Sequence, residues 1–281
     1  MSLRKLQDEF IAALNPLYDP GEAANIWYLV IESLTEINLR THPQTIFTPD
    51  GCFIKSIHDI IRRLQNYEPI QYILNEAWFY DIPFFVNHHV LIPRPETEEL
   101  VDWIIRENTK AIIHVLDIGT GSGCIPVILK RKIPLAYIWS CDISEQALKV
   151  AQKNATQYKT QINFLHLDFL NEQNWSKLPK VDIMVSNPPY IPQKDKAGMH
   201  RNVVQYEPHT ALFVTDENPL IFYDAIARAG RQLLQPDGKI YVEIHEALGT
   251  DTVAVFTQYG YSATLKKDMQ GKDRFVKAVY A

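Results

Sequence analysis

The chain has 281 residues, of which 46% are hydrophobic and 22% charged, a balance typical of soluble globular proteins and unlike disordered, collagen-like or rod-forming chains. At roughly 150 residues per domain, this length predicts one compact domain with a smaller one attached. The formal net charge of -5 excludes a general attraction to phosphate backbones or anionic lipid, so a nucleic-acid site would need a local concentration of positive charge.

The N-terminal residues 1–70 are expected to form a helical bundle. Apolar residues recur three or four positions apart over residues 3–14 and again over residues 57–64. Between these segments, Asp19-Pro20 predicts the start of another helix, with the aspartate as N-cap. Turn and breaker residues over 40–51 predict an irregular loop before the last helix.

The charge of this segment bears on its role. Residues 1–68 contain six basic and nine acidic side chains, a net charge of -3, which argues against binding to DNA or RNA. The segment carries no catalytic motif. We therefore expect a domain that recognises a folded protein substrate.

Residues 71–95 are expected to form a linker built on a β-hairpin. From Tyr72 to Val90 the sequence is rich in aromatic and β-branched residues, and Asp81-Ile82-Pro83 interrupts the run. This pattern predicts two short strands that connect the helical domain to the rest of the chain.

Residues 96–281 alternate strand-like apolar runs with helical stretches. A helix is expected to begin near Thr97, another to follow the first strand to about residue 131, and a third to cover residues 144 to about 158. The expected strands cover residues 112–116, 136–141, 162–167, 181–186, 239–245 and 274–280. This alternation predicts an α/β domain with a mostly parallel sheet and helices on both faces.

A glycine-rich loop, Gly119-Thr120-Gly121-Ser122-Gly123, follows the first expected strand. Glycines let the backbone approach a ligand closely, and the next helix offers unpaired amide donors. The spacing is G-x-G-x-G, and Cys124 stands where the dinucleotide fingerprint needs its third glycine. Asp117, just before the loop, would repel a pyrophosphate but attract a cationic amino group. The loop therefore predicts an amino-acid-bearing nucleotide such as S-adenosylmethionine.

Acidic residues also end the next two strands. Asp142 is placed to accept both ribose hydroxyls, and Asp168 with Phe169 to meet the amino group and the ring face of adenine. A strand-ending aspartate that only caps a helix is the alternative for each. Three such residues at successive strand ends favour a nucleotide site.

The strand at 181–186 leads into Asn187-Pro188-Pro189-Tyr190. The prolines lack backbone donors and are expected to hold the carbonyl of Pro188 beside the side-chain oxygen of Asn187. Two such acceptors can orient the planar NH2 of an amide or exocyclic amine and favour the charge that develops on its nitrogen during methyl transfer. Tyr190 is expected to stack on the planar group of the substrate. The alternative is an ordinary proline-rich turn.

These motifs resemble the HemK/PrmC family of protein-(glutamine N5) methyltransferases. The resemblance spans nearly the whole chain and includes residues 68–73, 90–98, 206–208 and 271–274. It implies a class I S-adenosylmethionine-dependent methyltransferase fold, Rossmann-like, with a mostly parallel seven-stranded sheet. It further implies methyl transfer to the side-chain amide nitrogen (N5) of the glutamine in the Gly-Gly-Gln motif of class 1 peptide chain release factors, in translation termination, with S-adenosylhomocysteine as product.

Carried over by position, the resemblance also implies roles for particular residues. The implied cofactor-binding residues are Asp117, Gly119, Thr120, Gly121, Ser122, Gly123, Asp142, Asp168, Phe169 and Asn187. The implied catalytic residues are Asn187, Pro188 and Tyr190, and Pro189 and Arg94 complete the substrate-binding set. Residues 213–220 and 245–247 depart from the family pattern, which leaves loop conformation and partner contacts open there.

Three other functions are weighed beside this one. They are methylation of a ribosomal-protein glutamine, amino-methylation of DNA, and a non-catalytic binding role on the same fold. The acidic helical domain and the absence of a basic target-recognition region disfavour DNA. The expected partner is a class 1 release factor, without direct contact to nucleic acid or membrane, and the expected state is a monomer.

The cysteines and histidines predict no metal or redox chemistry. Cys52, Cys124 and Cys141 form no C-x-x-C spacing, and the nine histidines show no H-E-x-x-H pattern. The N-terminus lacks the pattern of a secretory signal, and no apolar run is long enough to cross a membrane. We therefore expect a cytoplasmic protein without a metal.

Overall fold

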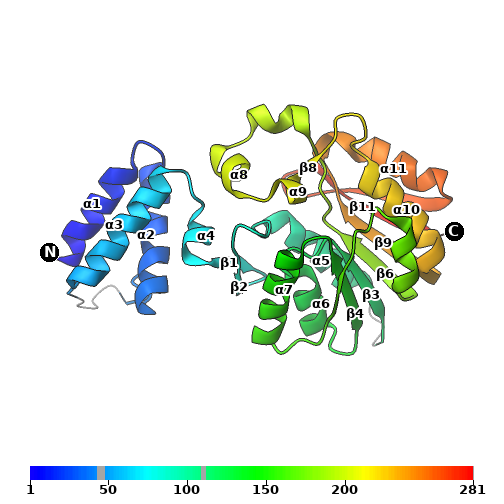
Figure 1. Cartoon of the computed structure of the whole chain (residues 1–281), viewed down its shortest axis with the longest axis horizontal. Coiled ribbons are helices and arrows are strands. Elements are labelled where there is room, and N and C mark those ends of the chain that lie inside the picture. The colour runs from blue at the N-terminus through cyan, green and yellow to red at the C-terminus, as the bar shows by residue number, and fades with distance from the viewer. Residues whose placement is uncertain (43–47, 109–111, 281) are drawn as a thin grey trace. The chain divides into compact units, whose positions relative to one another are not determined.

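The structure, a computed structural model, describes residues 1–42, 48–108 and 112–280. The chain folds into two compact units. The first, here the helical unit, comprises Met1–Glu76 and His200–Tyr206, and the second, here the sheet unit, comprises Ala77–Met199 and Glu207–Ala281. The chain therefore passes from one unit to the other three times (Figure 1).

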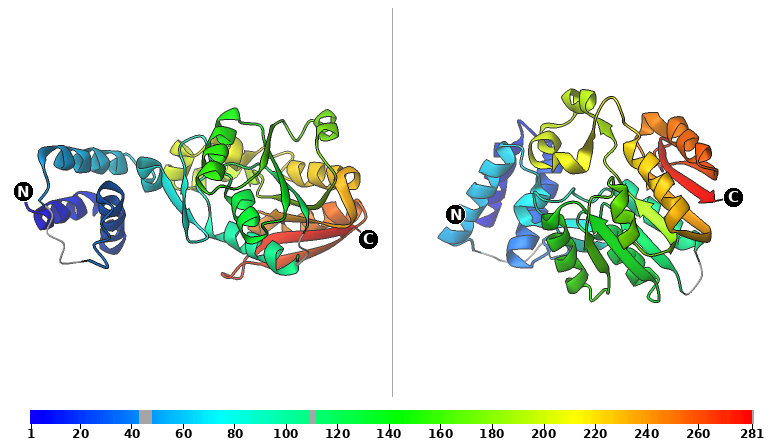
Figure 2. Two further views of the ribbon diagram at one scale, coloured as in Figure 1. Left: turned by 90° about the horizontal axis from the view of Figure 1, so that it is seen from below. Right: turned by 45° about the vertical axis from the view of Figure 1, so that its right-hand side comes forward.

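The helical unit is built from helices, of which the first three each bury an apolar face. Its elements are α1 (Leu3–Leu14), α2 (Pro20–Thr35), α3 (Gly51–Gln65), α4 (Ile70–Leu74) and α8 (Arg201–Tyr206). Phe10 of α1 packs edge-on against Trp27 of α2, and Ile57 and Leu64 of α3 join the same fully buried core. Figure 2 shows these helices from two further directions.

The helices expected over residues 3–14 and from Asp19-Pro20 are confirmed. Helix α3 begins earlier than the apolar stripe at 57–64, because the Asp50 side chain accepts a hydrogen bond from the Phe53 amide and caps the helix at Gly51. Of the loop expected at 40–51, residues 43–47 lie outside the described residues.

Helix α8 is joined to the end of α3. The Tyr206 hydroxyl donates to the Asn66 carbonyl (2.8 Å), and the Arg201 guanidinium lies over the Tyr67 ring. Residues 200–206 therefore belong to the helical unit, although they fall within the range expected for the α/β domain.

The expected hairpin exists but begins later than Tyr72. Residues Tyr72 and Ile73 lie in α4, and the strands are β1 (Glu76–Phe79) and β2 (Ile82–Phe85). Tyr80 and Asp81 between them adopt φ values of 55° and 60°, the left-handed conformation that tight hairpin turns require.

The sheet unit contains a seven-stranded sheet in the order β10-β11-β9-β6-β3-β4-β5. Its strands are β3 (His114–Ile118), β4 (Tyr137–Asp142), β5 (Asn163–His166), β6 (Val181–Ser186), β9 (Leu234–Glu243), β10 (Tyr261–Lys267) and β11 (Asp273–Tyr280). All neighbours from β9 to β5 pair in parallel, and β11 pairs antiparallel with both β9 and β10. The predicted α/β class and the mostly parallel sheet are confirmed.

Two details of the strands differ from expectation. Strand β3 covers residues 114–118 instead of 112–116, because it runs without a break into the turn at Gly119. Strand β10 was not expected: its sequence YSATLKK lies at the edge of the sheet and alternates exposed polar side chains with half-buried ones, so it lacks an apolar run.

Helices cover both faces of the sheet, as Figure 1 shows. The longer ones are α5 (Pro95–Glu107), α6 (Cys124–Lys132), α7 (Glu145–Gln157), α10 (Ile221–Leu233) and α11 (Gly249–Gln258). Short elements fill the connections: η1 (Glu172–Lys177), β7 (Ile191–Pro192), η2 (Gln193–Gly198), α9 (His209–Leu212), β8 (Phe213–Val214) and η3 (Glu246–Leu248). None of the described helices is both long and apolar enough to cross a membrane.

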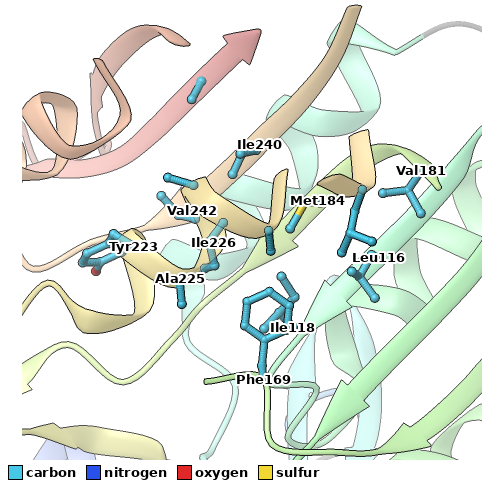
Figure 3. Packing of buried hydrophobic residues seen from close by; sticks show 14 of the residues in the cluster. Leu116, Ile118, Phe169, Val181, Met184, Tyr223, Ala225, Ile226, Ile240 and Val242 are labelled. Atoms are coloured by element: carbon cyan, nitrogen blue, oxygen red, sulfur yellow. The ribbon is translucent and has the colours of Figure 1, made fainter. Parts of the chain in front are cut away.

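Alternate residues of each central strand supply two separate cores. Leu116 of β3 and Met184 of β6 pack with α10 and α11, in the cluster drawn in Figure 3. Their neighbours Val115 and Ile183 pack with α5, α6 and α7 on the opposite face. Because side chains alternate along a strand, burial on both sides makes these strands read as continuous apolar runs.

The order of the strands fixes where a ligand can bind. The chain adds β4 and β5 on one side of β3 and then crosses to add β6 and β9 on the other. In such sheets the crevice opens at the carboxyl ends of the strands where the direction of winding reverses, here between β3 and β6. The loops that follow these two strands are the glycine loop and Asn187-Pro188-Pro189-Tyr190.

One buried asparagine holds the hairpin against the glycine loop. Asn154 of α7 is fully buried; its Oδ1 accepts from the Phe85 amide (2.8 Å), and its Nδ2 donates to the carbonyls of Phe85 (2.9 Å) and Ser122 (2.8 Å). All three of these bonds are lost if the side chain is shortened.

We expect Asn154→Asp to lower the free energy of unfolding by about 3 kcal/mol, because the buried carbonyls of Phe85 and Ser122 lose their donors. Denaturant unfolding of both proteins measures the change. The control is Asn171→Asp, an exposed residue whose side chain only accepts, from Gln173, and which should change stability by less than about 0.5 kcal/mol. Equal losses in the two variants would contradict this role.

Candidate active site

A cavity of about 410 Å³, here called the edge cavity, opens at the carboxyl ends of the parallel strands. Its volume lies in the range of roughly 300 to 1,000 Å³ usual for small-molecule sites. It is lined by the loops after β3, β4, β5 and β6, by the segment before α5, and by residues on either side of β8. The cavity thus collects most of the motifs that the sequence singles out.

The glycine loop is anchored at its two ends and open in the middle. The amides of Gly119 and Thr120 both donate to the Cys141 carbonyl of β4 (2.9 and 3.1 Å). Gly123 has a φ of 80°, and a Cβ there would lie 3.0 Å from the Ala151 side chain of α7. Gly121 has a φ of 53°, and a Cβ there would meet open space. The backbone at Gly121 is therefore exposed to a ligand in the cavity.

Asp142 lies beside this loop and lines the edge cavity. Its Oδ2 accepts from the Gly121 amide (2.9 Å), and its Oδ1 accepts from the Ser144 amide (2.8 Å). Burial raises the pKa of Asp142, although these amides favour the charged form. Both oxygens keep further acceptor capacity, so the residue fastens the loop and can still accept ligand hydroxyl groups.

Asp168 and Phe169 also line the cavity, but the ring of Phe169 is mostly buried in the hydrophobic core. Asp168 Oδ1 accepts from the Leu170 amide (2.9 Å). Phe169 is only 5% exposed and packs against Trp175 and beneath Ile118, as Figure 3 shows for Ile118. The apolar surface open to a ligand ring includes Ile143, which is 58% exposed and directly follows Asp142.

Asp117 does not line the cavity. It is fully buried behind the glycine loop, where Oδ2 accepts from the Ser140 hydroxyl (2.6 Å) and Oδ1 has no hydrogen-bond partner among the described residues. Burial raises the pKa of Asp117 to about 7, and nearby Asp142 adds to this effect. The attraction of Asp117 for a cationic amino group stays a prediction, and its unpartnered Oδ1 is the atom on which that prediction depends.

The residues of the NPPY segment separate into two groups. Asn187, Pro188 and Pro189 line the edge cavity. Asn187 Nδ2 donates to the Thr97 hydroxyl (3.0 Å), and no residue in the described ranges donates to its Oδ1. Tyr190 is not part of the lining: its hydroxyl donates to Glu243 Oε1 (3.0 Å), and its ring packs on the α10 core. Its expected stacking on the substrate has no support in this geometry.

Two residues of this site were not expected from the sequence, Thr97 and Glu243. Both are buried, and the Thr97 hydroxyl donates to Glu243 Oε2 (2.7 Å). Burial raises the pKa of Glu243, while the hydroxyls of Thr97 and Tyr190 and the charge of Arg274 lower it. The signal in the sequence is a glutamate inside the apolar run of β9, since a carboxylate rarely lies at a fully buried position unless it has partners.

Arg94 lines the cavity and forms an ion pair with a buried carboxylate. Its Nη2 lies 2.7 Å from Oε1 of Glu207, whose side chain is only 2% exposed and whose Oε2 also accepts from the Ile92 amide. Burial raises the pKa of Glu207, and the charge of Arg94 opposes this. The pair joins the segment before α5 to the residues that follow α8. Within the described residues no cluster of acidic, histidine and cysteine side chains could hold a metal ion.

Comparisons with known proteins identify relatives of this chain. Residues 98–209 match the family described as Methyltransferase small domain. The chain is 39% identical over 285 residues to a release factor glutamine methyltransferase of Flavobacterium psychrophilum, covering 99% of each chain. It is 41% identical over 268 residues to the protein of the same name from Bacteroides thetaiotaomicron, covering 95% of this chain and 96% of that one.

A solved structure shares the fold. A methyltransferase of Pyrococcus furiosus, 12% identical in sequence, superposes with a TM-score of 0.52 and covers 79% of this chain and 98% of that chain. At this identity the likeness concerns the fold alone.

The raised pKa of Asp117 predicts how stability depends on pH. An unfolded aspartate loses its proton near pH 4, whereas the folded protein keeps this proton up to about pH 7, so stability falls as pH rises between these values. We expect the wild type to lose up to about 4 kcal/mol more than Asp117→Asn over that interval. Urea unfolding at pH 4, 5.5, 7 and 8 measures the difference. Parallel curves for the two proteins would show that Asp117 is already ionised when buried.

Proposed function

The chain belongs to the family of release factor glutamine methyltransferases, and from this we propose that it methylates the side-chain amide nitrogen (N5) of the glutamine in the Gly-Gly-Gln motif of class 1 peptide chain release factors. The methyl donor is S-adenosylmethionine. The observation that carries the proposal is Asn187, whose Oδ1 remains free to accept a hydrogen bond while its Nδ2 is held by Thr97, at the wall of the edge cavity.

The residues of the edge cavity fit the proposed methyl donor. Gly121 leaves room for close approach, Asp142 can accept from ribose hydroxyls, and Ile143 offers an apolar surface for adenine. The orphaned Oδ1 of Asp117 lies behind the loop, where a cationic amino group would favour the ionised carboxylate. When bound, S-adenosylmethionine supplies an electrophilic methyl group on a positively charged sulfur.

The protein's part in the reaction is to position and polarise the substrate amide. A glutamine amide nitrogen is a weak nucleophile because its lone pair is delocalised into the carbonyl group. Asn187 Oδ1, with the Pro188 carbonyl, would accept hydrogen bonds from the NH2 group and stabilise the positive charge that develops there. Fixed positioning of two reactants can lower the barrier by ~7 to 11 kcal/mol. The methyl–sulfur bond breaks as the methyl–nitrogen bond forms, S-adenosylhomocysteine leaves as a neutral thioether, and the methylated nitrogen then loses its proton to water.

We assign substrate recognition to the N-terminal residues 1–70, which lie in the helical unit, while residues 96–281, apart from α8, carry the chemistry and residues 71–95 link the two. The helical unit contains none of the sequence motifs that line the edge cavity. Its net charge of -3 over residues 1–68 favours a protein partner over a nucleic acid. Helix α8 supports the assignment, since it is flanked along the chain by Gln193 and Pro208, which line the edge cavity. A translation-factor substrate places the enzyme in the cytoplasm, without a membrane partner, and the proposed state is a monomer.

The direct test of the substrate is transfer of a radiolabelled methyl group from S-adenosylmethionine to a purified class 1 release factor. Label should appear on the wild-type factor and be lost when the glutamine of its Gly-Gly-Gln motif is changed to alanine. Label on ribosomal particles instead would indicate the related activity on a ribosomal-protein glutamine.

We expect Asn187→Ala to lower kcat by at least about 100-fold, because it removes the acceptor that faces the amide nitrogen. Its affinity for S-adenosylmethionine should stay within about threefold of wild type, as calorimetry can measure. Comparable losses in turnover and in cofactor affinity would mean that Asn187 holds the cofactor and not the substrate.

We expect Asp142→Ala, unlike Asn187→Ala, to weaken cofactor binding. The affinity for S-adenosylmethionine should fall at least about 10-fold, since the variant loses the ribose acceptor and the anchor of the Gly121 amide. Calorimetric titration with S-adenosylhomocysteine should show the same loss. Unchanged affinity for both ligands would remove Asp142 from the cofactor site.

A further inference from the structure

We propose that Glu243 and Thr97 are positioning residues that fix which end of the Asn187 side chain faces the substrate. The inference rests on the function proposed above and adds to it the group that sets the direction of the Asn187 amide. It concerns one chain of hydrogen bonds, from Glu243 through Thr97 to Asn187, here called the relay.

The pairing of the strands brings the ends of the relay together. Ser186 of β6 lies opposite Val242 of β9, so Asn187, which follows β6, comes beside Glu243, the last residue of β9. Thr97, in the first turn of α5, lies between their side chains. The three residues come from parts of the chain far apart in sequence, and no local motif contains them all.

The hydrogen bonds of the relay have a fixed direction. The Thr97 hydroxyl has a single hydrogen, and it donates this hydrogen to Glu243 Oε2 (2.7 Å). The Thr97 oxygen then has only lone pairs to offer Asn187, and it accepts from Nδ2 (3.0 Å). The flipped amide would place Oδ1 against that oxygen, with no hydrogen between them. The relay therefore leaves Oδ1 facing the edge cavity.

Glu243 is held in the accepting state by a second hydroxyl. Tyr190 donates to Oε1 (3.0 Å), so each carboxylate oxygen receives one hydrogen bond, and the Tyr223 hydroxyl fixes the backbone by donating to the Glu243 carbonyl (3.1 Å). Arg274 contributes a favourable charge. Tyr190 thus acts on Asn187 through Glu243, which gives this residue of the NPPY segment a role outside the cavity.

The direction of the amide matters because the two ends of asparagine are chemically opposite. Oδ1 accepts from the NH2 group of the substrate and stabilises developing positive charge, whereas Nδ2 in its place would oppose both. The two orientations have nearly the same shape, so packing alone does not select between them. Only a neighbour with a fixed hydrogen-bond polarity can make the selection.

The test compares Thr97→Val, Thr97→Ser and Glu243→Gln in the full-length enzyme with release factor as substrate. Thr97→Val keeps the shape but loses the hydroxyl, and Glu243→Gln can present either NH2 or oxygen to Thr97. Each should lower kcat by about 10- to 100-fold, with S-adenosylmethionine affinity within about threefold of wild type. Thr97→Ser, which restores the hydroxyl, should recover most of the activity lost in Thr97→Val.

Thr252→Val is the matched control for the loss of a buried hydroxyl. Thr252 of α11 is fully buried in the same unit, and its Oγ1 has no hydrogen-bond partner among the described residues. The same chemical change there should leave kcat unaltered. Thermal unfolding of all variants separates a loss of folded protein from a loss of turnover.

Coupling to Asn187 distinguishes the relay from an independent effect. On an Asn187→Ala background, Thr97→Val should lower kcat no further, because the relay acts only through the asparagine. A full additional loss in the double variant would overturn the proposal, as would wild-type kcat in Thr97→Val.

A spectroscopic measurement tests the relay independently of the proposed function. In protein labelled with 15N-asparagine, the side-chain NH2 signals of Asn187 are identified by their absence in Asn187→Ala. They should shift in Thr97→Val and Glu243→Gln and remain in place in Thr252→Val, without any substrate present. If they shift as expected but the wild type methylates no release factor, the relay stands and the substrate assignment fails; if they do not move, the relay is wrong.

Discussion

The parallel pairing of β3, β6 and β9 is the constraint on which the rest of the site depends. Ile118 of β3 lies opposite Ser186 of β6, which lies opposite Val242 of β9, and the Ser186 hydroxyl donates to the Ile118 carbonyl (2.7 Å). Because the three strands end in register, the residues that follow them emerge at one edge. The glycine loop, Asn187 and the buried Glu243 are thereby brought together, although more than 120 positions separate the first from the last.

Several carboxylates at this edge are buried or half-buried, and they are held by different kinds of partner. Asp142 is held by backbone amides, Glu243 by two hydroxyls, and Glu207 by Arg94. Asp117 is the exception, since one of its oxygens has no partner among the described residues. A buried carboxylate costs stability unless it is paired, so this arrangement gives up stability to hold fixed polarity around a ligand. A bound cation near the unpaired oxygen of Asp117 would recover part of that cost.

The sequence alone predicted much of the fold and of the candidate site, and the features that it did not predict share a physical cause. Strong local patterns predicted the glycine loop, Asp142, the NPPY segment and most strands, because each depends on spacing or on residues with unusual backbone properties. Strand β10 was missed because it is a half-exposed edge strand without an apolar run. Tyr190 and Asp117 do not line the edge cavity, because which way a side chain points depends on its partners in three dimensions. Thr97 and Glu243 were not predicted as site residues for the same reason, since their hydrogen-bond partners are distant in sequence.

The chemistry of the enzyme depends on this edge of the sheet presenting an amide nitrogen for methylation. Fragmentation mass spectrometry of the peptide that carries the Gly-Gly-Gln motif, taken from a release factor after reaction with the enzyme and S-adenosylmethionine, tests it most directly. We expect the added mass of one methyl group, located on the side chain of the glutamine and released as methylamine on acid hydrolysis. A methyl group on any other residue, or none on this peptide, would contradict it.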